Sequence, residues 1–221
     1  QDCLTFMHVN CRSLSSQFSA FTNMIHLSAL KSSIVAVTET WTSVDTESNF
    51  SMLGYTFLVK SRKGKAGGGV GLYVSSDLSY KVRDDLCTDA PDIYESVFIE
   101  VVDVTNTLIG CVYRPPNSDV NAFNAAFDTL LSKINSSKLS CYVAGDFNVD
   151  LLKHHTHLPT ADHLNSIFTY GFLPLINRPT RITEYSATLI DNIYTNAYAK
   201  HISTPYVLCA DIADHLPVIV H

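Results

Sequence analysis

The sequence predicts an α/β fold in a single domain spanning residues 1–221. Runs of β-branched and aromatic residues, each of strand length, recur in both halves of the chain. Twice, a segment with helical spacing of apolar residues comes directly before such a run. Apolar residues make up 46% of the chain and charged residues only 16%, against about 25% in ordinary soluble proteins. This composition indicates a large core and excludes a disordered chain.

The first half predicts one helix and several strands. Between residues 15 and 33, Phe18, Phe21, Ile25 and Leu30 recur near helical spacing, and a β-branched strand, IVAVTETW, follows. Turn-forming residues separate three further strand candidates, which are GGGVGLYV (67–74), SVFIEVVDV (96–104) and TLIGCVYR (107–114). These runs predict a sheet.

The second half repeats the order of helix and then strand. Apolar side chains from Asn121 to Ile134 share one helical face, and SCYVAG then forms a strand that ends in GDFN. A third helix is expected at about 160–170, with Thr160 as its N-cap and Gly171 at its end. The tail alternates turns with short strands, in LPLIN, LIDNIYT, PYVLCA and LPVIVH. Periodicity alone predicts an α/β domain and nothing more specific.

Composition also restricts the compartment and the partners. No run approaches the ~18 apolar residues of a membrane span, and the N-terminal residues lack a secretory signal pattern. The chain starts without Met and stops inside an apolar run, so we expect a module cut from a longer protein. The cysteines form no CxxC pair, so we expect buried free thiols in a reducing, intracellular compartment: Cys3, Cys11, Cys87, Cys111, Cys141 and Cys209.

Polar side chains stand where several strand-like runs begin or end, so they can converge at one rim of a sheet. Carboxylates gathered there would repel one another unless a divalent cation were bound, and oxygen ligands favour Mg²⁺ or Mn²⁺. Such ions are often shared with phosphate, so a phosphodiester is the natural substrate. The net charge of −6 counts against nucleic acid unless such a cluster binds a cation. The residues are Asn10, Glu39, Asp146, Asn148, Asp191, Asp214 and His215.

GDFNVD is the most distinctive of these clusters. Its glycine allows a tight exit from the strand, Asp146 can position or deprotonate a water, and Asn148 can donate to a phosphoryl oxygen. An ordinary Asx turn is the alternative interpretation.

The tetrapeptide ADHL occurs twice and so provides an internal comparison. We assign chemistry to Asp214 and His215, which precede an apolar strand, and we interpret Asp162 and His163 as surface residues of the third helix. That helix is expected to bury Leu164, Ile167 and Phe168.

Two basic or histidine-rich segments have simpler interpretations. KGKAGGGVG lacks the Lys-Ser/Thr of a phosphate-binding P-loop and predicts a turn into a strand. Lys60, Arg62, Lys63 and Lys65 form a basic patch there, either a solvated loop or a contact to a DNA backbone. HHTH at 154–157 is interpreted as a polar loop rather than a metal site.

These motifs, in this order, resemble the endonuclease/exonuclease/phosphatase superfamily, and within it the apurinic-endonuclease-like domain of non-LTR retrotransposons. HVNCRSL, ETW, GGGVGLYV, YRPP, GDFNVDLL, RPTRIT, ATLIDNIYTN and DHLPVIV carry the resemblance over nearly the whole chain. It implies a DNase I-like four-layer α/β sandwich, with two packed mixed sheets flanked by helices. It also implies Mg²⁺-dependent nicking of double-stranded DNA in the nucleus, leaving a 3′-hydroxyl for target-primed reverse transcription by a reverse transcriptase domain of the same chain.

The resemblance also implies a role for each site residue. Glu39 would bind the metal directly, with Asn10 organising it and Asp214 assisting the metal or the leaving group. Asp146 would align or deprotonate the attacking water. The remaining residues would contact or stabilise the phosphate, with Asp191 orienting His215: Tyr113, Asn148, Asp191 and His215.

Three departures from the family pattern stand out. Ala213 replaces a common serine, so one hydroxyl hydrogen bond should be lost and activity weakened rather than abolished. Pro116 stands where related repair enzymes have an asparagine, and Asn117 follows one position later. The segment between PTRIT and LIDNI is short, and three threonines are candidates to support the site: Thr180, Thr183 and Thr188.

Other functions remain alternatives. An abasic-site repair endonuclease of the same fold ranks second, and inositol-phosphate or sphingomyelin phosphodiesterases rank third. A non-catalytic DNA-docking module belongs to a different class, and it would have no need for mutually repelling carboxylates.

Overall fold

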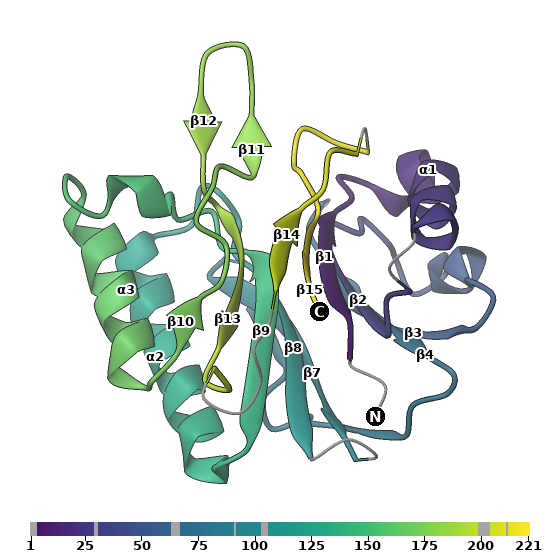
Figure 1. The fold of residues 1–221 in the computed structure, drawn as a ribbon, viewed down its shortest axis with the longest axis horizontal. Helices are drawn as coiled ribbons and strands as arrows, with labels where there is room; N and C mark the ends of the chain where they lie inside the picture. The colour runs from purple at the N-terminus through teal and green to yellow at the C-terminus, as the bar shows by residue number, and fades with distance from the viewer. Residues whose placement is uncertain are drawn as a thin grey trace.

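Two β-sheets pack face to face, and helices cover their outer faces (Figure 1). The computed structural model describes residues 4–28, 31–62, 67–90, 92–102, 106–198, 204–210 and 212–221. Helix α1 lies outside one sheet, and helices α2 and α3 lie outside the other, which makes four layers. The predicted α/β class and the four-layer sandwich with two mixed sheets are therefore confirmed.

The described part of the first sheet has six strands in the order β14-β15-β1-β2-β4-β3. Strands β1 and β2 are parallel because α1 crosses over between them, and the other pairs are antiparallel. The elements are β1 (Phe6–Asn10), α1 (Leu14–Leu27), β2 (Ile34–Thr38), β3 (Tyr55–Lys60), β4 (Val70–Ser75), β14 (Pro205–Val207) and β15 (Val218–Val220), with a 3₁₀ turn, η1 (Glu47–Phe50), before β3.

The second sheet runs β10-β13-β9-β8-β7-β5, and β6 also pairs with β7. Only β8 and β9 are parallel in its described part, and α2 forms the crossover between them. The elements are β5 (Tyr80–Val82), β6 (Thr88–Ala90), β7 (Tyr94–Val101), β8 (Thr107–Tyr113), α2 (Val120–Ser137), β9 (Ser140–Asp146), η2 (Leu151–Lys153), α3 (Leu158–Thr169), β10 (Leu173–Pro174) and β13 (Asp191–Thr195). A hairpin of β11 (Arg181–Ile182) and β12 (Ala187–Thr188) projects beyond the sheets (Figure 1).

Alternation along the strands produces two separate cores. On β2, Ile34 and Ala36 face the second sheet and join its apolar residues, whereas Val35 and Val37 pack with Phe21 of α1. Side chains of a strand point alternately to opposite faces, so a strand buried on both faces reads as a continuous apolar run. Burying each large apolar side chain contributes roughly 1.5–3 kcal/mol, and this burial fixes the register that aligns the strand ends.

The α3 region differs from the sequence-based expectation. Helix α3 starts at Leu158 with His157 in the N-cap position, and the Thr160 hydroxyl contacts His157 Nδ1 from the first turn. The prediction of Thr160 as the N-cap was therefore wrong. Pro159, at the second position of the helix, explains the earlier start because its missing N–H lies where no helical partner exists.

The outer face of α3 was also predicted incorrectly. His163 is fully buried, with Nε2 3.1 Å from the Tyr194 hydroxyl, whereas Phe168 is 49% exposed. Aromatic neighbours enclose the imidazole, and burial lowers the pKa of His163 to about 3. Asp162 is exposed as expected, and Ile167 is buried.

Some smaller expectations also need correction or lie outside the described residues. Cys209 is exposed just after β14, although Cys11, Cys111 and Cys141 are buried free thiols as predicted. Leu30, Lys63, Lys65 and Cys3 lie outside the described residues. No helix in the described ranges is long and apolar enough to cross a membrane.

Candidate active site

The site lies where β8, β9 and β13 meet at one rim of the second sheet. Asp146 is the last residue of β9, and its register partners on the two neighbouring strands are Tyr113 and Asp191. Three residues proposed from the sequence are thus adjacent because their strands are paired. Asp146 and Asp191 are both fully buried.

Asn10 links the two sheets at this rim. Its side-chain Nδ2 donates to Glu39 Oε1 at 3.0 Å and to Asp146 Oδ2 at 2.8 Å, while its Oδ1 accepts from the backbone N–H of Arg12 at 3.0 Å. Because a backbone N–H can only donate, this last bond fixes the amide orientation. Glu39 follows β2 with a positive φ of 53°, a strained conformation that aims its carboxylate at Asn10.

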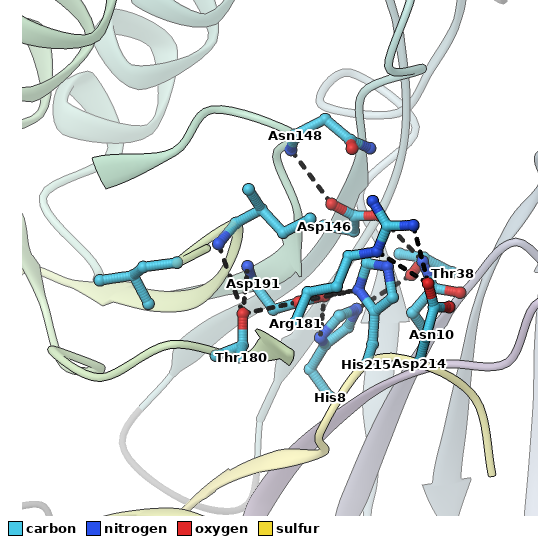
Figure 2. A network of polar contacts seen from close by, with 12 residues as sticks. His8, Asn10, Thr38, Asp146, Asn148, Thr180, Arg181, Asp191, Asp214 and His215 are labelled. Atoms are coloured by element: carbon cyan, nitrogen blue, oxygen red, sulfur yellow. Dashed lines mark hydrogen bonds and ion pairs between the residues drawn. The ribbon is translucent and has the colours of Figure 1, made fainter. Parts of the chain in front are cut away.

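Asp191 holds His215 beside Asp146 (Figure 2). The imidazole Nδ1 lies 2.9 Å from Asp191 Oδ2 and 3.1 Å from Oδ1. Burial lowers the pKa of His215, but the charge of Asp191 and the hydrogen bond to it outweigh burial and raise the pKa to about 9. His215 is therefore an imidazolium at neutral pH.

Thr180 is the supporting threonine that the sequence left open. Its hydroxyl donates to Asp191 Oδ2 at 2.8 Å and accepts from the backbone N–H of Asp191 at 3.0 Å. Thr183 instead bonds within the hairpin to Ser186, and Thr188 pairs along the hairpin with Arg181.

The donor set fits a divalent cation. Burial raises the pKa of Asp146 well above its usual range, and the nearby charge of Asp191 raises it further. Ligand atoms of Asp146, Asp191 and His215 lie within 4.8 Å of one another. A protonated His215 has no free lone pair, so oxygen atoms of Asp146 and Glu39 are the better ligands. A bound cation would supply positive charge that offsets the negative charges of these carboxylates.

Comparison with known proteins establishes the family. The model of the endonuclease/exonuclease/phosphatase family matches residues 7–215. The chain belongs to this family. The match includes all of the proposed site residues, from Asn10 to His215. A search of curated proteins gave no match.

Solved structures agree on the fold. The endonuclease domain of TRAS1, a telomere-specific non-LTR retrotransposon, is 13% identical, with a TM-score of 0.75 over 98% of this chain and 96% of that one. An AP endonuclease from Archaeoglobus fulgidus is 16% identical, with a TM-score of 0.74 over 99% of both chains. A 3′ phosphatase from Neisseria bound to a product DNA hairpin is 14% identical, with a TM-score of 0.74 over 99% of both chains.

In this member of the family, Arg114 positions Asn148. Arg114 Nη1 donates to the Asn148 carbonyl at 2.9 Å, and Asn148 Nδ2 donates back to the Arg114 carbonyl at 2.8 Å. The second arginine nitrogen, Nη2, donates to the Ser118 carbonyl. Asn148 has a φ of 48°, and its backbone N–H donates to Asp146 Oδ1 at 3.1 Å. In the sequence, Arg114 is visible only as part of the YRPP motif, and the motif does not reveal this role.

Tyr113 directs a buried ring into the site. Burial is the main cause that raises the pKa of its hydroxyl, and the charges of Glu39 and Asp146 raise the pKa further. The hydroxyl therefore remains a hydrogen-bond donor at neutral pH. The Arg62 guanidinium lies 5.7 Å from the ring centroid and pairs with Glu95. The Arg62 side chain is only 9% exposed, so its assignment to a solvated or DNA-contacting basic patch was wrong.

The Asp214 carboxylate forms ion pairs with two arginines. Arg181 Nε and Nη2 lie 2.8 and 2.7 Å from Asp214 Oδ2, and Arg12 Nη1 lies 3.3 Å from Oδ1. Burial raises the pKa of Asp214, but the hydrogen bond and charge of Arg181 outweigh it, so the pKa is lowered overall. Asp214 therefore stays ionised without a metal.

His8 is a further buried neighbour that the sequence analysis did not single out. Its Nε2 lies 3.0 Å from Thr38 Oγ1 and its Nδ1 lies 3.8 Å from Asp191 Oδ1. Burial lowers the pKa of His8 to about 4 although Asp191 acts in the opposite direction, so His8 is neutral when His215 is charged. A histidine inside the apolar run FMHV was the available signal.

The departures from the family pattern lie at the surface of the site. Pro116 and Asn117 are exposed in the turn after Tyr113. Ala213 offers no hydroxyl, and the contacts to its neighbour Asp214 come from the two arginines.

Proposed function

We propose that the chain is a Mg²⁺-dependent DNA endonuclease that nicks double-stranded DNA and leaves a 3′-hydroxyl. One observation carries the proposal. The buried chain from Thr180 through Asp191 to His215 presents an imidazolium beside Asp146, and Asn10 joins Asp146 to Glu39. His215 supplies an acidic N–H, Asp146 can act as a base, and the Glu39 carboxylate can bind a cation. This arrangement suits attack of water on a phosphodiester.

Glu39 and Asp146 would hold the Mg²⁺, with Asn10 fixing the spacing of their oxygen atoms. Mn²⁺ has the same ligand preferences and should substitute for it. When bound, the cation supplies positive charge to the phosphoryl oxygens as negative charge develops on them. In the proposed assignment Asp214 assists from the rim, through the leaving group or the metal.

The side chains divide the remaining work. Asp146 orients a water and takes its proton as the water oxygen bonds to phosphorus. His215 donates a hydrogen bond to a phosphoryl oxygen and stabilises the pentacovalent phosphate. The Tyr113 hydroxyl and the Asn148 amide hold further phosphate oxygens. The bond from phosphorus to the 3′ oxygen then breaks. This oxygen takes a proton from solvent and leaves as the 3′-hydroxyl, and the phosphate stays on the 5′ end of the other fragment.

The biological setting is part of the same proposal. Similarity to the TRAS1 retrotransposon domain supports a role in a non-LTR element. The nick would then prime reverse transcription on nuclear DNA, with a reverse transcriptase domain in the same full-length chain. The DNA hairpin in the Neisseria neighbour supports nucleic acid as the substrate class.

Plasmid nicking tests the proposal. Supercoiled plasmid should convert to the nicked circle with Mg²⁺ but not with EDTA, and both Asp146→Asn and His215→Gln should lose the activity. Asp162→Asn is the matched control, because Asp162 stands in the first ADHL sequence, outside the site, and is exposed on α3. Binding of the plasmid without nicking would instead support a docking module.

A duplex with one abasic site distinguishes the proposed nicking enzyme from the second candidate, an abasic-site repair endonuclease. An abasic-site endonuclease should cut this duplex far faster than the intact one. The proposed nicking enzyme should cut both at comparable rates.

A further inference from the structure

Two guanidinium groups share one carboxylate at the rim of the site. Arg12 follows β1 of the first sheet, Arg181 lies in β11 at the base of the hairpin, and both contact Asp214. Figure 2 shows Arg181 extending toward Asp214 beside His215. Two positive charges against one negative charge leave this corner with an excess of one positive charge.

Most donors of these two arginines are unused. Each guanidinium has five N–H groups. Arg181 places Nε and Nη2 on Asp214, and Arg12 places only Nη1 there. Neither side chain has another partner in the described part of the chain. The Arg12 and Arg181 side chains are 59% and 41% exposed, so their free N–H groups face solvent.

Other arginines near the site are used differently. Arg114 is 2% exposed and donates to two backbone carbonyls, and Arg62 is buried against Glu95. Both guanidinium groups are buried and bonded to protein groups, and the two nitrogens without a partner, Arg62 Nη2 and Arg114 Nε, are not accessible to solvent. Arg12 and Arg181 therefore provide the accessible guanidinium groups next to the catalytic side chains in the described ranges.

Both arginines are tied to the site through their own backbones. The Arg12 backbone N–H donates to Asn10 Oδ1, and Arg181 follows Thr180, which bonds Asp191. Arg181 also forms a β-bridge with His215. A ligand bound by both guanidinium groups would thus lie beside the reacting phosphate.

We propose that Arg12 and Arg181 form a binding site for a backbone phosphate of the DNA next to the scissile bond, and that Asp214 competes with this phosphate for them. This inference rests on the proposed function only in taking nucleic acid as the ligand. Ion pairs that are open to solvent contribute little to stability, so a phosphate can displace Asp214 easily. Arginine suits this role because its planar fork matches two phosphate oxygens.

Because Asp214 competes with the phosphate, replacing an arginine and replacing Asp214 should change the affinity for DNA in opposite directions. Loss of either arginine should weaken DNA binding, since each lost phosphate contact lowers affinity roughly tenfold at 0.1 M salt and lowers the salt slope by about one. Asp214→Asn should tighten binding several-fold because it releases both guanidinium groups. This gain should vanish when Arg12 and Arg181 are both replaced by Gln.

Fluorescence anisotropy with a labelled 20-base-pair duplex in EDTA, over a range of KCl, measures these effects without cleavage. Arg83→Gln and Asp85→Asn are matched controls, because these residues form an ion pair just after β5, the strand that pairs with β7 on the side away from β8 and the site. Circular dichroism confirms folding, and Arg181→Lys should retain part of the affinity.

Three results would overturn the inference: arginine variants no weaker than Arg83→Gln, an Asp214→Asn gain that persists without the arginines, or no duplex binding by the wild type. Nicking of plasmid with Mg²⁺ is scored separately. The wild type can show the predicted binding pattern and fail to nick, which refutes the proposed function alone. It can also nick without the pattern, which refutes only the arginine site.

Discussion

Replacing Asp191 by Asn should change how the stability of the protein depends on pH. Asn preserves the size of the side chain but removes the charge that holds the proton on His215. In the wild type the pKa of His215 is about 9, against an ordinary value of 6.5. The folded protein therefore keeps a proton that the unfolded chain releases near pH 6.5. The stabilising contribution is complete below that pH and is lost as pH rises through about 9.

The size of the effect follows from these two pKa values. At about 1.4 kcal/mol for each pKa unit, their difference corresponds to about 3 kcal/mol of unfolding free energy. Burial alone lowers the pKa of His215, so the Asn variant should lose most of this dependence.

Urea denaturation of both proteins in EDTA at pH 6.5 and at pH 9 measures how the free energy of unfolding depends on pH. Comparing the two proteins cancels the contribution of cysteine thiols, which ionise near the upper pH in both unfolded chains. Parallel stability curves for the two proteins would refute the assignment of the imidazolium to the Asp191 pair.

Three further substitutions test other parts of the site. Asp146→Asn should raise the melting temperature in EDTA, because it removes a buried carboxylate whose pKa is raised, while nicking falls about 10²–10⁴-fold; a lower melting temperature would contradict this. Thr180→Val leaves the buried Asp191 one donor short and should cost about 1–3 kcal/mol in urea denaturation, so unchanged stability would argue against that bond. Arg114→Lys cannot contact both carbonyls and should slow nicking through Asn148 while duplex affinity in EDTA is retained; equal losses of rate and affinity would count against a positioning role.

Strand periodicity predicted the α/β class well because both faces of the central strands are buried, whereas the four layers were implied by the family resemblance. Val35 and Val37 face α1 while Ile34 and Ala36 face the other sheet, and such a run can only be a strand between two apolar layers. The α3 region was harder to predict. His163 and Phe168 exchange their expected exposures because aromatic residues distant in sequence enclose the histidine, and a helical pattern does not reveal them.

The candidate site was predictable to a similar degree. Acids at strand ends converge because their strands pair, so Asp146 and Asp191 could be placed together. The arginines were not predictable, since a charged side chain on a turn carries no periodic signal. Only the folded chain shows that Arg12 and Arg181 meet at Asp214 and that Arg114 holds Asn148. Choosing Thr180 among three threonines likewise required the position of Asp191.

The chemistry of the nicked end shows whether cleavage leaves a 3′-hydroxyl that a polymerase can extend. Supercoiled plasmid is treated with the wild type and Mg²⁺, and then with a DNA polymerase and labelled nucleotides, without any phosphatase step. The proposed cleavage should give nicked circles that the polymerase extends at once, and no label after treatment with His215→Gln. Plasmid that stays supercoiled, or nicks that accept label only after phosphatase treatment, would contradict it.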